Sequence, residues 1–231
     1  MPDEHERDLE ATKRLDAFVD AAFAFAVTLL VIAGVETTTS LSALWTAVGR
    51  IPASLGAFVL IGWFWLSYRD FGHLAPRRDT ISTLTGLAIV FVVLVYVFPL
   101  RMLVESGFVW ASRGRLPGQA IIETLDDLRL LFRVYGLGFA VLAALFVGLY
   151  AHAVRASDRL GVTPDGKESA RTSAEIWAIV AGSGVLSALL TFAPLRYAPW
   201  LPGFAYWCIP LAIALRGWLI ALASRRRAAT N

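Results

Sequence analysis

Side chains capable of catalysis or metal binding are few in this sequence and are dispersed along it. The three histidines, His5, His73 and His152, share no metal-ligand spacing, and Cys208 is the single cysteine. The sequence contains no H-E-x-x-H, C-x-x-C, P-loop or G-x-S-x-G pattern. We therefore expect no enzyme activity, no catalytic residues, no metal site and no cofactor.

Two charged residues inside apolar stretches are stronger candidates, because ionisable side chains in a membrane are costly and are often functional. Asp20 stands near the start of the first apolar stretch, where a carboxylate also interacts well with a helix N-terminus. Arg216, in the last apolar stretch, either snorkels toward the membrane surface or pairs with an acid at similar depth. Asp20 and Glu175 are the two acids that fit, and our hypothesis is a pair of Asp20 and Arg216.

The first apolar stretch also carries one continuous stripe when it is drawn as a helix with about 100° per residue. The opposite side of this helix carries Asp20 and smaller side chains. The stripe fits a lipid-facing surface, and it equally fits a narrow hydrophobic pore of the kind that gates by dewetting. Its members are Phe18, Ala21, Phe25, Thr28, Leu29, Ile32 and Glu36.

The composition shows where these stretches must lie. The chain has 231 residues, of which 57% are hydrophobic and 17% charged, and the mean hydropathy is +0.63. Soluble domains carry about 25% charged residues, so we expect an all-α, multi-pass protein of the cell's inner or plasma membrane. A single six-helix transmembrane domain over residues 1–231 is predicted, with spans at 18–35, 51–67, 84–104, 130–154, 176–195 and 204–223.

The basic residues predict the orientation of these spans. Six spans put both termini on one side, and that side carries 13 lysines and arginines against 6 on the other. Because basic residues favour the cytoplasmic side, both termini are expected in the cytoplasm. The net charge of +3 is too small to indicate nucleic-acid binding.

Residues 14–31, RLDAFVDAAFAFAVTLLV, resemble the first helix of the transmembrane protein 175 family, which comprises endosomal and lysosomal potassium channels and single-repeat prokaryotic relatives. The family pattern is R-x-x-x-F-S-D, followed by an apolar run that ends in T-L-L-V. Arg14, Phe18 and Asp20 match it, as do residues 28–31, while Val19 replaces the serine. Residues 64–66, FWL, and the basic turn before Asp79 resemble a second family pattern.

The resemblance implies a homotetramer whose first helices line a central pore without a carbonyl filter. The family's apolar constriction residues and the nearby threonine correspond to Phe25, Leu29, Ile32 and Thr28. The family's arginine, phenylalanine and aspartate, here Arg14, Phe18 and Asp20, form a structural motif near the cytoplasmic side.

The function implied is a channel for potassium or other monovalent cations, potassium-preferring, with a hydrophobic constriction and proton leak as a further property. Several departures from the family bear on this. Phe25 stands where isoleucine is usual, Tyr68 and Arg69 stand where histidines are frequent, and Gly86 stands where asparagine is frequent. Two alternatives therefore stay open: a non-conducting membrane assembly protein of the same fold, and a small secondary transporter.

Overall fold

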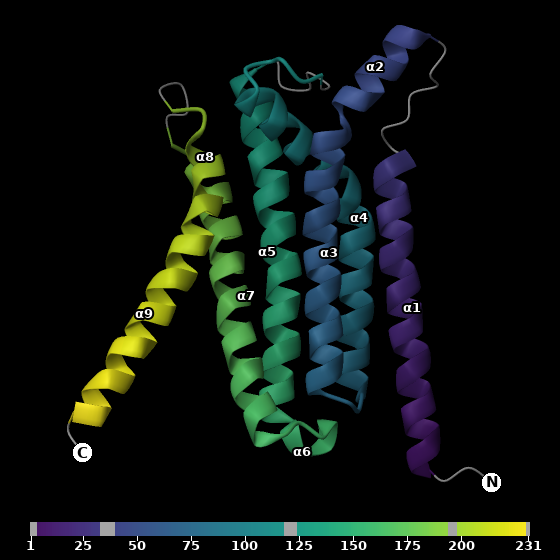
Figure 1. The fold of residues 1–231 in the computed structure, drawn as a ribbon, viewed down its shortest axis with the longest axis vertical. Helices are drawn as coiled ribbons and strands as arrows, with labels where there is room; N and C mark the ends of the chain where they lie inside the picture. The colour runs from purple at the N-terminus through teal and green to yellow at the C-terminus, as the bar shows by residue number, and fades with distance from the viewer. Residues whose placement is uncertain (1–3, 33–39, 118–123, 194–197, 230–231) are drawn as a thin grey trace. The chain divides into compact units, whose positions relative to one another are not determined.

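The computed structural model describes residues 4–32, 40–117, 124–193 and 198–229, and these residues form helices joined by short connections (Figure 1). No strand occurs within these ranges. The helices are α1 (Glu4–Ile32), α2 (Leu41–Gly49), α3 (Ile51–Leu74), α4 (Thr80–Ala111), α5 (Leu125–Arg155), α6 (Ser157–Leu160), α7 (Pro164–Leu190), α8 (Leu201–Phe204), the 3-10 helix η1 (Ala205–Trp207) and α9 (Cys208–Ala229).

Five of these helices are long and apolar enough to cross a membrane, namely α1 from Leu9, α3, α4, α5 and α7. They correspond to the first five predicted spans, and the protein is a multi-pass membrane protein. The sixth predicted span, at 204–223, falls on α8, η1 and α9. Side chains from residue 219 onward lie outside the described part of the chain, and the sixth crossing stays a prediction.

The chain forms two compact units. The first comprises Met1–Glu123 and Leu145–Ala174, and the second comprises Thr124–Ala144 and Glu175–Asn231. Long helices α5 and α7 each contribute residues to both units.

In the first unit, α1 lies beside α3 and α4 (Figure 1). Helix α4 begins at a capping box, in which the Asp79 carboxylate accepts from the Ser82 backbone N–H and the Ser82 hydroxyl oxygen accepts from the Asp79 N–H, both at 2.9 Å. The core is aromatic: Phe64 stacks near Phe146, and Phe71 meets Tyr150 edge-on with ring centroids 5.9 Å apart.

In the second unit, α5 and α7 cross closely at two glycines. A Cβ added to Gly184 would lie 2.7 Å from the Gly136 carbonyl oxygen, and one added to Gly136 would lie 2.6 Å from the Gly184 carbonyl oxygen. Only glycine permits this approach, because any side chain would collide with the facing backbone.

The structure corrects the start of the fifth predicted span. The turn before this helix lies at Gly161, which adopts a positive φ of 70° and closes α6. Pro164 is the first residue of α7, a position that proline favours because its missing N–H has no helical partner there. Helix α7, the fifth membrane-spanning helix, therefore begins twelve residues before the predicted start at 176. Helix α2 is a short helix that was not predicted.

Candidate functional site: the first helix and its anchors

Helix α1 has one face packed into its unit and another left bare. Val19, Phe23, Ala26 and Leu30 recur at spacings of four, three and four residues, and none is more than 3% exposed. This spacing places all four on one side of a helix, and that side packs against α3 and α4.

The predicted constriction residues lie on the bare face. Phe25 is 55% exposed and Ile32 is 61% exposed, Thr28 is exposed, and Leu29 is half-buried. The Thr28 hydroxyl donates to the Ala24 carbonyl oxygen, at 3.0 Å, within the same helix. The four side chains therefore share one apolar surface that the rest of the unit does not cover.

Asp20 ties α1 to α3. Its carboxylate accepts a hydrogen bond of 2.8 Å from the indole Nε1–H of Trp65. Of the other two motif residues, Phe18 is 54% exposed on the bare face, and Arg14 pairs with Glu10 one turn earlier at 2.8 Å. The structure therefore brings Asp20 to a neighbouring helix, whereas the ion pair of Arg14 lies within α1.

A second anchor at this end was not predicted. The Arg78 guanidinium donates to the Asp16 carboxylate at 2.9 Å and to the Ala75 carbonyl oxygen, and lies 4.9 Å from the centroid of the Phe71 ring. Arg78 is almost fully buried, with 4% of its side chain exposed, so the pair holds α1 against the α3–α4 connection. Asp16 and Arg78 are far apart in sequence, and no local spacing links them.

Two departures from the family pattern fit each other in space. Tyr68 is 3% exposed, and a Cβ added to Gly86 would lie 2.8 Å from its hydroxyl oxygen. The bulkier Tyr68 on α3 therefore occupies space that the absence of a side chain at Gly86 on α4 leaves free.

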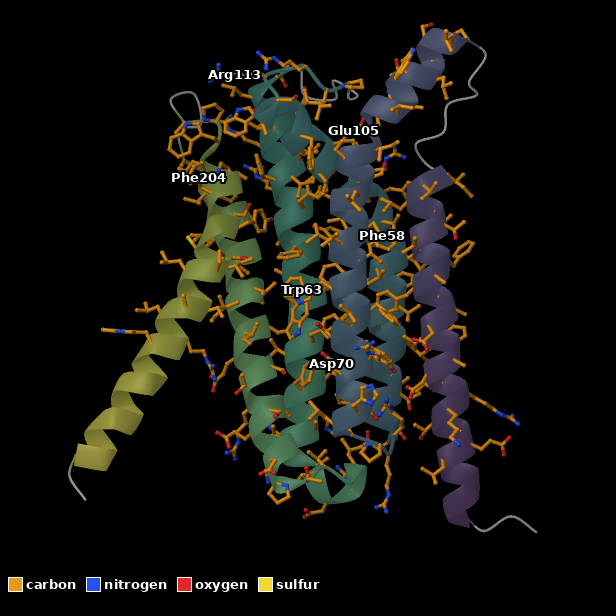
Figure 2. The ribbon with its side chains drawn as sticks, viewed as in Figure 1. Phe58, Trp63, Asp70, Glu105, Arg113 and Phe204 are labelled. Carbon is orange, nitrogen blue, oxygen red and sulfur yellow. The ribbon has the colours of Figure 1, made fainter. Side chains whose placement is uncertain are left out.

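The other end of α1 meets a buried charged cluster, also not predicted. Arg101 of α4 donates to the Leu30 carbonyl oxygen at 3.3 Å, and its Nε lies 3.9 Å from Glu105, one turn further along. Arg50, which precedes α3, lies 3.4 Å from the same carboxylate. Figure 2 shows Glu105 close to the last residues of α1 and the first residues of α3. The sequence signal that could have indicated this cluster is the i, i+4 spacing of Arg101 and Glu105 within an apolar helix.

Asp79 joins α4 to α5 within the first unit. Its Oδ2 lies 2.7 Å from the Nε2 of His152. Burial raises the pKa of the Asp79 carboxyl, but the hydrogen bonds of Ser82 and His152 outweigh burial, so its pKa lies below the ordinary value. The carboxylate is therefore a structural acceptor, with its lone pairs committed to the cap and to the imidazole.

In the second unit, Arg216 of α9 pairs with Glu175 of α7. Glu175 was one of the two predicted partners, and Asp20, the other, bonds to Trp65 instead. The Arg216 side chain is 24% exposed, so an ion pair with Glu175 accounts for an arginine in an apolar helix.

The arrangement positions an apolar helix face and offers no reactive centre in the ranges that the structure describes. No group of three histidine, cysteine, aspartate or glutamate side chains there is placed to hold a metal ion. Of the charged residues of α1, Asp16 and Asp20 are bonded to neighbouring elements of the protein.

Comparisons with known proteins find similarity to one family. Residues 14–99 match the model of the family described as endosomal/lysosomal potassium channel TMEM175. A protein of Marivirga tractuosa named "Potassium channel" is 27% identical over 230 residues, which cover 92% of this chain and 89% of that protein.

Two crystal structures share the fold. A variant of the potassium channel MtTMEM175 aligns with a TM-score of 0.77 at 23% identity, over 90% of this chain and 93% of that one. A lysosomal potassium-selective channel TMEM175 homologue from Chamaesiphon minutus aligns with a TM-score of 0.59 at 22% identity, over 90% and 98%. The chain is therefore similar to the TMEM175 family over residues 14–99, and it shares the helical fold of these two channels over 90% of its length.

Proposed function

We propose that the protein is a cation channel that prefers potassium, with a pore lined by α1 from several copies of the chain. The observation that carries the proposal is the bare apolar face of α1, on which Phe25 and Ile32 are more than half exposed. The family, and the name of the relative from Marivirga tractuosa, support it.

In this proposal the barrier to an ion is dehydration. Rings of Phe25, Leu29 and Ile32 cannot replace the water around a cation, because these three side chains carry no oxygen atom and no charge. Potassium holds its hydration shell less tightly than sodium, so a hydrophobic constriction admits potassium at the lower free-energy cost. A thread of water through the constriction would also carry protons, which accounts for the proton leak.

The proposed assembly is a homotetramer with both termini in the cytoplasm. A single α1 cannot enclose a pathway, whereas four copies placed around an axis can. The cytoplasmic placement follows from the distribution of basic residues, 13 on the side of the termini against 6 on the other.

A second candidate function is a non-conducting membrane assembly protein of the same fold. Phe25 favours it, because four exposed phenyl rings converging on one axis would fill a narrow pathway. The two candidates make opposite predictions for the wild-type protein.

The test is potassium flux into liposomes that contain the purified full chain under an imposed potassium gradient. We expect flux above empty liposomes, and a roughly tenfold increase for Phe25→Ala, because loss of the ring lowers the barrier by about 1.4 kcal/mol. Phe91→Ala is the matched control, since Phe91 is 68% exposed but lies on α4.

Each outcome separates the candidates. Flux from Phe25→Ala but not from the wild type supports the assembly protein. Absence of flux from both proteins overturns the channel proposal. Equal increases for Phe25→Ala and Phe91→Ala would contradict a pore lined by α1.

A further inference from the structure

A cavity of about 580 Å³ lies in the first unit where α1 ends and α2 and α3 begin. Its apolar wall comes from all three helices and includes Val31, Val48, Ile51, Leu55 and Phe58. These five side chains are between 42% and 59% exposed, so the wall is accessible from outside the unit.

Two arginines complete the wall. Arg50 and Arg101 both line the cavity, and no acidic residue is among its described lining residues. Glu105 contacts both guanidinium groups without lining the cavity, and so holds them in place. The cavity thus has a long apolar side and a cationic side.

Helix α2 indicates the depth of this cavity in a membrane. It has nine residues, too few to cross a bilayer, and its sequence LSALWTAVG is mostly apolar with none of its residues buried. Trp45 on this helix is 69% exposed. A short apolar helix with an exposed tryptophan is typical of the membrane interface, where phospholipid headgroups lie.

We propose that the cavity binds one anionic phospholipid from the surrounding bilayer. The lipid phosphate accepts hydrogen bonds from Arg50 and Arg101, whose planar guanidinium groups match phosphate oxygens. An acyl chain lies along Leu55 and Phe58, which run down the first two turns of α3 into the apolar layer. Such a lipid matches both sides of the cavity, because its anionic phosphate suits the two arginines and its acyl chain suits the apolar wall.

The site has a direct link to α1, because Arg101 also donates to the Leu30 carbonyl oxygen near the end of that helix. Binding itself does not depend on conduction. The experiment therefore measures lipid binding, and its outcome is independent of the flux test of the channel proposal.

The experiment is native mass spectrometry of the full chain, released from detergent micelles titrated with palmitoyl-oleoyl phosphatidylglycerol or with the corresponding phosphatidylcholine. We expect one phosphatidylglycerol per chain to be retained, with at least tenfold weaker retention of phosphatidylcholine. Loss of one charge-assisted contact in Arg50→Gln should weaken phosphatidylglycerol binding roughly tenfold, and Arg50→Lys should restore most of it.

Two further variants keep the test decisive if Arg50→Gln does not fold. Ser54→Trp fills the cavity without removing a charge, and should abolish retention of phosphatidylglycerol. Arg115→Gln removes an exposed arginine outside the cavity, and should leave it unchanged. Equal binding of the two lipids, or equal retention by wild type and Ser54→Trp, would overturn the proposal.

Discussion

Asp20 illustrates at the level of one residue how a carboxylate is accommodated in an apolar helix. Its hydrogen bond from Trp65 spans 45 positions of sequence and fixes the lower part of α1 to α3. The nearby pair of Asp16 and Arg78 anchors the same helix again. Two charges at one end of α1 are therefore structural and do not face the bare surface.

The first prediction concerns this bond. Trp65→Phe keeps an aromatic ring but removes the donor, and should lower the free energy of unfolding by about 1 kcal/mol, less than is usual for hydrogen bonds to charged groups because Asp20 is exposed. Thermal unfolding in detergent, followed by size-exclusion chromatography, measures the effect. Trp110→Phe is the control, since Trp110 is 70% exposed. Equal losses in the two variants would contradict a specific role for the bond.

Sequence could predict some of these residues and not their partners. The pairing of Arg216 with Glu175 was one of two alternatives, because depth in the membrane limits the choice of acid. Trp65 could not be assigned to Asp20, since an indole near a helix end equally fits the membrane interface. Arg101 and Glu105 were missed because a single pair at helical spacing does not indicate the carbonyl group that Arg101 reaches.

At the level of elements, five membrane-spanning helices were predictable because about 20 apolar residues in succession have few other solutions. Their ends were less predictable. Polar residues extend α7 back to Pro164, and hydropathy does not register a helix that continues beyond the membrane. Helix α2 is too short for a hydropathy signal.

The second prediction concerns the crossing of α5 and α7. In Gly184→Ala the new methyl group would lie 2.7 Å from the Gly136 carbonyl oxygen, so the helices must separate, which should destabilise the protein by about 1–3 kcal/mol. In Gly182→Ala nothing lies within 4 Å of the new methyl group. That matched variant should be neutral or slightly stabilising, because alanine favours helices. Thermal unfolding of the two variants measures the difference in stability. An equal effect of the two substitutions would contradict the close crossing.

For the whole molecule, the bare face of α1 is an apolar surface that its own unit leaves uncovered. The four predicted constriction residues share one face of α1, on which Leu29 is half-buried and the other three are exposed among the described residues of the first unit. Their role at a pore axis stays a prediction, as does the tetramer, because one chain cannot show what another copy contributes.

The third prediction tests that arrangement. In a Cys208→Ser background, Phe25→Cys should form a disulfide between copies under mild oxidation, because copies of α1 meet at the axis. Phe91→Cys should not, although Phe91 is similarly exposed on α4. Non-reducing gels of the protein in liposomes show the product. A protein that stays monomeric with both variants would exclude a shared axis lined by α1.

The hydrogen bond within α1 from Thr28 to Ala24 has a consequence for the sign of the permeant charge. The hydroxyl hydrogen is directed at the helix's own carbonyl oxygen, so only the oxygen lone pairs are left for an outside partner. A surface that can only accept hydrogen bonds turns the oxygen, not the hydrogen, toward whatever passes it. In the proposed pore, a ring of such hydroxyl oxygens would repel chloride and attract a cation, with no formal charge on Thr28 itself.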